Sequence, residues 1–341
     1  MTSWWAPRAW VAGEMKRDVL LVEADGAFTS VEVGVQQPQD AVVIDGVVLP
    51  GFVNAHSHAF HRALRGRTHR GRDSFWSWRD QMYEVAAALD PDSYRALATA
   101  VFAEMLEAGY TCVGEFHYLH HDASGTPYGD ANAMSHALVA AAADAGIRLT
   151  LLDTLYLESG PGRAPAATQR RFSDGSALAW MERTAQLSDD RTLRNGLAVH
   201  SVRAVPPDAI RTAAQLASDR DVPLHAHVSE QPRENDECRT AYGATPVEIL
   251  ARAGALGPGF TAVHATHLAS GDIDALSGSH VCVCATTERD LADGVGPMPA
   301  LREAGALLCL GSDSHAIVDP FEEGRAIELD ERLASMRRGT F

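Results

Sequence analysis

The sequence almost lacks lysine. Lys16 is the only lysine among 29 basic residues, and all the others are arginines. A lysine nucleophile, a Schiff-base lysine and the lysine of a phosphate-binding loop are therefore excluded everywhere past residue 16. A modified lysine that bridges two metal ions is excluded for the same reason. The 15 histidines remain as the main source of reactive side chains.

Long apolar runs are also missing. No stretch approaches the roughly 18 uninterrupted apolar residues of a membrane-spanning helix, and the N-terminus has no apolar signal core. The five cysteines are odd in number and lack zinc-knuckle spacing, which predicts reduced, buried thiols in a cytoplasmic protein. The formal charge of −16 argues against nucleic acid or an anionic membrane as partner, because both repel an acidic surface.

Residues 1–50 differ in pattern from residues 51–341. The first part holds short apolar runs around 19–22, 31–33 and 42–44, which predict a small all-β unit. The second part alternates apolar strands with helices whose starts are marked by Asp90-Pro91, Asp130 and Thr245-Pro246. The expected strands are residues 47–58, 110–118, 147–157, 193–202, 222–230, 260–268, 280–288 and 306–315. Eight strands that are apolar on both faces predict a parallel (β/α)8 TIM-type barrel.

Polar residues able to do chemistry end at least five of these strands. They are His56 and His58, His200, His227, His264, and Asp313. In a barrel of this type the functional groups collect at the carboxyl ends of the strands. An isolated His-x-His pair is compatible with a surface strand, but apolar strands have no structural reason to end in this way repeatedly. His225, the neighbour of His227, is expected to face outward.

Three imidazoles and a carboxylate (His56, His58, His227 and Asp313) suit a single Zn²⁺ with one position left for water, and Fe²⁺ is the alternative metal. Zinc lowers the pKa of a bound water to about 7. Glu230 lies three residues beyond His227 and is expected to shuttle a proton from this water to a leaving nitrogen. His264 is expected to stabilise charge that develops on the substrate.

This set of residues, with its motifs at 56–58 and 311–313, resembles the amidohydrolase superfamily in its mononuclear deaminase branch. The resemblance implies a barrel joined to a small β-sandwich, with residues 1–50 as part of the sandwich and residues 51–341 as the metal-dependent barrel. The lack of lysine fits this branch, since many binuclear members carry a carboxylated lysine after the fourth strand.

A narrower resemblance covers nearly the whole chain. Residues 73–79 (DSFWSWR), 114–121 (GEFHYLHH), 200–205 (HSVRAV) and 263–267 (VHATH) are similar to formimidoylglutamate deiminases. These enzymes hydrolyse N-formimidoyl-L-glutamate to N-formyl-L-glutamate and ammonia in histidine degradation. The resemblance implies that Asp313 accepts a proton as well as binding metal.

The same resemblance implies the groups that hold the dicarboxylate substrate. Arg203 and Tyr118 would bind carboxylate, His200 would contact the substrate near the metal, and Arg79 would reach in from the neighbouring subunit of a homodimer. A planar guanidinium can grip a carboxylate with two parallel hydrogen bonds. His61 stands where the family often has a substrate-binding glutamine, and it can still donate to a carboxylate.

Two alternatives remain open. A related zinc deaminase or chlorohydrolase would act on a neutral purine or triazine ring, although such a ring has no need of Arg203 and Arg79. An inactive metal-binding protein is the other alternative, because the chain ends at Phe341 whereas the family normally continues through a C-terminal segment that completes the β-sandwich.

Overall fold

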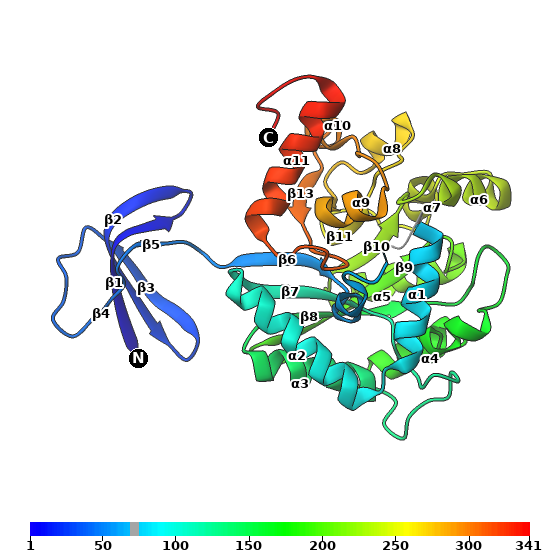
Figure 1. Ribbon diagram of the computed structural model, residues 1–341, viewed down its shortest axis with the longest axis horizontal. Helices are drawn as coiled ribbons and strands as arrows, with labels where there is room; N and C mark the ends of the chain where they lie inside the picture. Colours follow the sequence, from blue (N-terminus) through cyan, green and yellow to red (C-terminus); the bar gives the residue numbers. More distant parts are fainter. Residues whose placement is uncertain (69–74) are drawn as a thin grey trace. The chain divides into compact units, whose positions relative to one another are not determined.

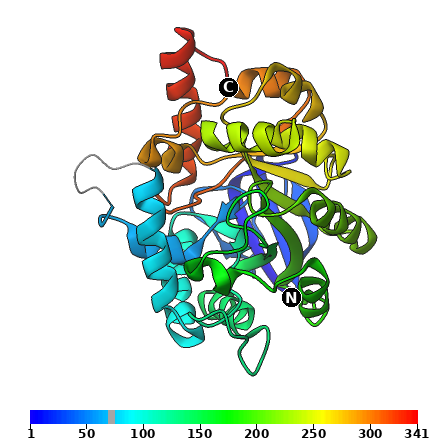
Figure 2. The ribbon, with the colours of Figure 1, turned by 90° about the vertical axis from the view of Figure 1, so that its right-hand side faces the viewer.

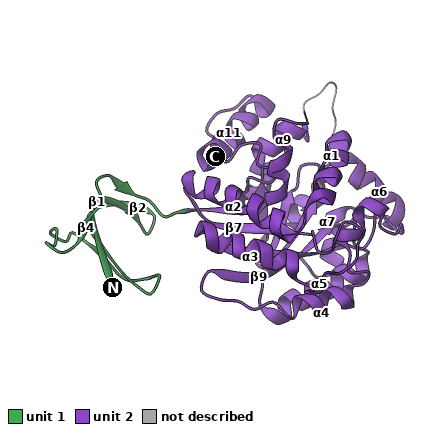
Figure 3. Cartoon of the chain, turned by 60° about the horizontal axis from the view of Figure 1, so that its bottom comes forward, with its two compact units in different colours: residues 1–51 green, residues 52–341 purple. Residues whose placement is uncertain are grey.

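The computed structural model describes residues 1–68 and 75–341. The chain divides into two compact units, Met1–Gly51 and Phe52–Phe341, which Figure 3 shows in different colours. Residues 73 and 74, the first two of the DSFWSWR motif, lie outside the described residues. Within the described residues, no helix combines the length and the apolar character that crossing a bilayer requires.

The N-terminal unit is a five-stranded sheet. Its strands are β1 (Thr2–Val11), β2 (Glu14–Ala24), β3 (Ala27–Val33), β4 (Val42–Val43) and β5 (Val47–Val48). They are ordered β3-β2-β1-β4, and β5 also pairs with β1. A tight turn with positive φ at Ala12 and Gly13 joins β1 to β2. Lys16 lies in this sheet, where it pairs with Glu14 and is remote in sequence from every proposed ligand.

The second unit contains an eight-stranded sheet, among the residues that the structure describes, in which every neighbouring pair of strands is parallel. The strands are β6 (Phe52–Ser57), β7 (Tyr110–His117), β8 (Arg148–Leu155), β9 (Leu193–Ser201), β10 (Leu224–Val228), β11 (Phe260–His264), β12 (His280–Val283) and β13 (Leu307–Leu310). A bridge between Ser57 and Asp313 brings the ends of β6 and β13 together. The predicted barrel is thereby confirmed.

Helices surround these strands, as Figures 1 and 2 show from two directions. They are α1 (Phe75–Ala88), α2 (Pro91–Glu107), α3 (Ala133–Ala145), α4 (Ala177–Thr184), α5 (Pro207–Arg220), α6 (Pro232–Tyr242), α7 (Pro246–Arg252), α8 (Ser270–Ala275), α9 (Ala285–Leu291), α10 (Met298–Glu303) and α11 (Pro320–Ser335), with 3-10 helices η1 (Ala59–Leu64) and η2 (Ala167–Phe172).

The predicted helix starts have the expected caps at two places. Asp90 accepts from the Ser93 amide at 2.8 Å, and Thr245 accepts from the Glu248 amide at 3.1 Å. In contrast, α3 begins after Asn132 and not at Asp130. The Asp130 carboxylate accepts from the Asn132 amide at 2.9 Å, which holds residues 130–132 in a turn before the helix.

Several strand predictions were wrong in extent. The sixth and eighth strands, expected to reach residues 268 and 315, end at His264 and Leu310. Residues 47 and 48 form β5 and pair with β1, so the first barrel strand begins only at Phe52. The seventh strand was expected to run to residue 288, but it ends at Val283 and the helix α9 follows. The Glu288 carboxylate accepts from the Cys284 amide at 3.0 Å, and this bond helps to end the strand and start the helix.

Candidate active site

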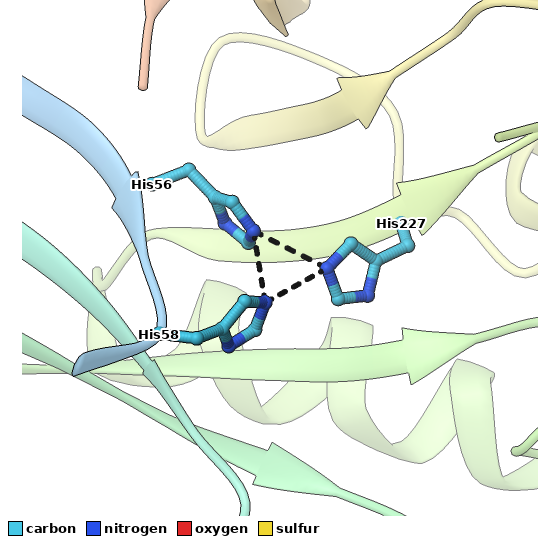
Figure 4. A group of neighbouring side chains, drawn as sticks. All are labelled: His56, His58 and His227. Carbon is cyan, nitrogen blue, oxygen red and sulfur yellow. Dashed lines mark hydrogen bonds between the residues drawn. The ribbon is translucent and has the colours of Figure 1, made fainter. Parts of the chain in front are cut away.

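Three histidines converge at the carboxyl ends of two strands. His56 is the next-to-last residue of β6, His58 directly follows this strand, and His227 is the next-to-last residue of β10. Their Nε2 atoms are 3.1 Å (His56–His58), 3.2 Å (His58–His227) and 3.2 Å (His227–His56) apart (Figure 4). All three side chains are buried.

The hydrogen bonds made by the Nδ1 atoms of His58 and His227 determine whether their Nε2 atoms carry a hydrogen or a lone pair. His58 Nδ1 donates to the Phe116 carbonyl at 2.9 Å, and His227 Nδ1 donates to the His200 carbonyl at 2.9 Å. Burial, together with the neighbouring histidines, holds the pKa of both rings well below the usual value, so both are neutral. A neutral ring that donates from Nδ1 carries a lone pair on Nε2. Lone pairs that face each other at this distance fit a shared cation.

Asp313 supplies the carboxylate. Its Oδ1 atom lies 3.4 Å from the Nε2 atoms of both His56 and His58. Burial by itself would raise the pKa of Asp313, but the hydrogen bond and charge interaction with His56, with help from His264, lower it below its usual value. Asp313 has φ 43°, a left-handed conformation that a non-glycine residue seldom adopts and that is found preferentially at functional sites.

Glu230 and His264 form an acid-base pair beside this cluster. His264 Nε2 is 3.7 Å from Glu230 Oε1, and its Nδ1 is 3.3 Å from Glu288 Oε1. Burial would lower the pKa of His264, but Glu230, Glu288 and Asp313 raise it to about 10, so the ring is a cation. Burial raises the pKa of Glu230 above its usual range, although the His264 cation opposes this. A cationic ring and a carboxyl of raised pKa are suited to moving protons.

The residues predicted to bind substrate line one pocket with these groups. The pocket has about 540 Å³ of empty volume, and its lining includes His61, Arg79, Tyr118, His200, Arg203, Glu230, His264 and Asp313. His61 Nε2 and the Tyr118 hydroxyl are 3.0 Å apart, and burial lowers the pKa of His61 to about 3. The centre of the His200 ring lies 5.1 Å from the centre of the His227 ring and 4.7 Å from that of Tyr156, so His200 contacts both the histidine cluster and a tyrosine of the pocket lining.

Two guanidiniums line the same pocket and lie near one tryptophan ring. The Cζ atoms of Arg79 and Arg203 lie 4.5 and 5.9 Å from the centre of the Trp76 ring. Arg79 lines the pocket of its own chain, whereas the resemblance implied that it reaches the site of a neighbouring subunit; the homodimer stays a prediction. Within residues 1–68 and 75–341, neither guanidinium has a carboxylate oxygen within 4.0 Å. Two cations without such a partner in the lining of a pocket suit an anionic ligand.

Several residues of the site carried no signal in the sequence. Glu288 was expected in a strand and instead holds His264 from helix α9. Gln169, from η2, donates to the hydroxyls of Tyr83 at 3.0 Å and Tyr156 at 2.8 Å and so fixes two tyrosines of the pocket wall. No local spacing marks these residues, because each contacts a residue of the pocket lining from a separate part of the chain.

The orientation of His225 differs from its prediction. It was expected to face outward, but it lines a hollow with side chains from other barrel strands, among them Thr261 and His280. The prediction was wrong because residues two apart on a strand, such as His225 and His227, share a face.

Comparisons with known proteins agree with this geometry. Residues 47–340 match the model of the amidohydrolase family. The formimidoylglutamate deiminase of Pseudomonas aeruginosa is 38% identical over 99% of this chain and 76% of the relative, and the 8-oxoguanine deaminase of the same organism is 30% identical over 88% and 68%. A crystal structure of an amidohydrolase from Brucella melitensis superposes with a TM-score of 0.91 at 34% identity, covering 100% of this chain and 77% of that one. The zinc complex of atrazine chlorohydrolase from Arthrobacter aurescens has a TM-score of 0.85 at 22% identity, covering 99% and 78%, and shares the fold.

Proposed function

This chain belongs to the amidohydrolase family, and we propose that it hydrolyses N-formimidoyl-L-glutamate to N-formyl-L-glutamate and ammonia with the help of one divalent metal ion. One observation carries the proposal beyond the family. The pocket lined by His58 and His227 is also lined by two guanidiniums, Arg79 and Arg203, that lack a carboxylate partner among the described residues. A substrate with two carboxylates supplies what these cations lack.

His56, His58, His227 and Asp313 would hold the metal ion, with zinc as the proposed ion and Fe²⁺ as the alternative. The converging Nε2 lone pairs and the ionised carboxylate suit such a cation. When bound, the ion would polarise the C=N group and make a water molecule more acidic. The related chlorohydrolase structure, which shares the fold, contains zinc.

The protein's own groups account for the proton movements. Glu230 can take a proton from the attacking water and return it to the departing nitrogen, since burial keeps its pKa raised. His264, held as a cation by Glu230 and Glu288, can donate a hydrogen bond to the substrate atom on which charge develops. Asp313 can receive the second proton of the water.

The other residues would select and orient the substrate. Arg203 and Arg79 would bind carboxylate, and the Tyr118 hydroxyl with His61 would contribute a further hydrogen bond. The pKa of His200 lies well below its usual value because of burial and the charges of Arg203 and Arg79. His200 therefore stays neutral and can contact the formimidoyl group without adding charge.

Release of ammonia from N-formimidoyl-L-glutamate tests the proposal. Purified, zinc-loaded protein should release one ammonia per substrate, measured with a coupled glutamate dehydrogenase assay. Glu230→Gln should be inactive, and this variant controls for contaminating activity. Guanine, 8-oxoguanine and S-adenosylhomocysteine should give no ammonia. Turnover of any of these compounds without turnover of the formimidoyl substrate would refute the proposal and favour the ring deaminase alternative. The rings are tested because the chain is 30% identical to an 8-oxoguanine deaminase.

A further inference from the structure

Behind the proposed metal ligands lies a continuous chain of buried hydrogen bonds. Asn54 Nδ2 donates to Ser312 Oγ at 2.6 Å, and Ser312 Oγ is 2.9 Å from His315 Nδ1. His315 Nε2 is 3.2 Å from Ser57 Oγ, which donates to Glu115 Oε2 at 2.5 Å. All five residues are 0% exposed, so the chain is shielded from water.

The hydrogen bonds of this chain all run in one direction. Because the Ser57 hydroxyl gives its hydrogen to Glu115, Ser57 Oγ accepts from His315 Nε2. With Nε2 of His315 donating to Ser57, the other ring nitrogen, Nδ1, accepts from the Ser312 hydroxyl. Ser312 Oγ in turn accepts from the Asn54 amide. Every donor of the chain has an acceptor, which is the arrangement that makes a buried polar network rigid.

The two ends of the chain fasten the backbone beside the ligands. Glu115 Oε1 accepts from the Ala59 amide at 2.6 Å, while Oε2 accepts from Ser57, so that one carboxyl group holds both neighbours of His58. At the other end, Asn54 Oδ1 accepts from the amide of Ser312, the residue before Asp313, at 3.0 Å. The network therefore joins the segment that carries His58 to the segment that carries Asp313.

These two segments need such support. Asp313 and His315 both have left-handed φ values, 43° and 58°, which cost free energy and persist only where the surroundings hold them. Three ring nitrogens within 3.2 Å of one another also repel when no cation lies between them. Without restraint, the ligand side chains would move apart and metal binding would have to reassemble them.

We propose that Ser57, Glu115 and His315 are positioning residues that hold the ligands His58 and Asp313 in place and thereby set the metal affinity of the protein. None of the three is a proposed metal ligand or substrate contact. The inference rests on the proposed metal site, and it does not depend on which substrate is hydrolysed.

The sharpest test is Ser57→Ala, because it removes one hydroxyl and breaks both the Glu115 and the His315 links. Ser279→Ala is the matched control. Ser279 is likewise 0% exposed, and its hydroxyl oxygen accepts one bond, from the Gly257 amide at 3.0 Å. The Zn²⁺ dissociation constant of each purified protein is measured by competition with a chromophoric chelator, and the melting temperature of the metal-free protein is measured alongside.

Ser57→Ala should bind Zn²⁺ about 10 to 100 times more weakly than the wild type, as for other losses of support to metal ligands. Ser279→Ala should keep the wild-type constant within about twofold, even if both variants lower the melting temperature. The visible absorption of Co²⁺-loaded protein gives a second readout, because it reports the arrangement of the ligands. Its bands should change in Ser57→Ala and stay as in the wild type in Ser279→Ala.

An unchanged Zn²⁺ constant and Co²⁺ spectrum in folded Ser57→Ala would overturn the inference. If Ser57→Ala does not fold, Glu115→Gln takes its place with the same expectation. The glutamine keeps the size of the side chain and an oxygen that accepts from Ala59, but an NH2 group replaces the oxygen that accepts from Ser57. A wild type that binds neither metal would overturn the metal site and this inference together. Metal binding without turnover of N-formimidoyl-L-glutamate, with the Ser57→Ala effect present, would refute only the proposed substrate.

Discussion

Arg203→Ala tests how the pocket recognises its substrate. In the structure the Arg203 guanidinium lies beside the Trp76 ring and has no carboxylate oxygen within 4.0 Å among the described residues. A carboxylate bound in the two-pronged manner would receive two charge-assisted hydrogen bonds, each contributing about 1.5–3 kcal/mol. Their loss amounts to about 3–6 kcal/mol, or roughly 10²- to 10⁴-fold in kcat/KM.

The lower end of this range is the expected one. Arg79 lies against the same ring, 4.5 Å from its centre, and still offers a positive charge to the carboxylate. We therefore expect kcat/KM for N-formimidoyl-L-glutamate to fall about 100-fold in Arg203→Ala, mainly through a higher KM, because neither carboxylate takes part in the bond that breaks. Arg203→Lys should recover only part of the loss, since an ammonium cannot form the two parallel bonds.

A truncated substrate separates recognition from general damage to the site. Formamidine has the reacting group but no carboxylate, so the wild type and Arg203→Ala should hydrolyse it at the same slow rate. Arg211→Ala is the control variant, because Arg211 is exposed on α5 and paired with Asp208 at 2.9 Å. Steady-state ammonia release measures all of these rates. If kcat/KM for the full substrate were unchanged, or if formamidine turnover fell equally, the carboxylate role of Arg203 would be refuted.

Three further predictions concern charge and stability. Glu288→Gln removes one of the carboxylates that raise the pKa of His264, so the alkaline limb of the kcat/KM profile should move to lower pH; a limb that stays in place would show that His264 need not be protonated. Several buried histidines have pKa values lowered by burial to about 3 or 4, namely His61, His120, His225 and His315. Because the unfolded chain binds protons at these sites near pH 6.5 and the folded chain does not, each contributes stability that is lost as pH falls, about 1.4 kcal/mol per unit. Buried carboxyls with raised pKa values, such as Glu234 and Glu323 at about 7, add stability as the pH falls from about 7 to 4.5, which offsets the loss from the histidines. Below about pH 4.5 this offset ends, so the urea midpoint of the metal-free protein should fall most steeply between about pH 4.5 and 3. Finally, Arg183→Met should cost about 3–5 kcal/mol in urea unfolding, because it leaves the buried Asp153 and Asp174, now 2.8 and 2.9 Å from the guanidinium, without their cation; a loss below 1 kcal/mol would contradict this reasoning.

The sequence by itself determined the barrel and the groups at its strand ends. Apolar strands that alternate with capped helices specify a parallel sheet, because local periodicity and capping depend only on nearby residues. The histidines at 56, 58 and 227 and Asp313 could be picked out for the same reason, since each lies at or just after the end of an expected strand. The resemblance of the motifs to a deiminase family added the expected substrate.

Only the tertiary structure decided which of these groups meet and what surrounds them. The meeting of His227 with His58, 169 positions away, depends on the closure of the barrel. Residues 285–291 form a helix whose start is held by the bond from the Cys284 amide to the Glu288 carboxylate. The same carboxylate raises the pKa of His264. The chain from Asn54 to Glu115 crosses between β6, β7 and the segment after β13, and no spacing in the sequence records it. Hydrogen bonds and charge interactions act between atoms that are close in space, whatever their separation along the chain. The donors and acceptors can therefore be identified from the sequence, whereas only the fold determines how they pair.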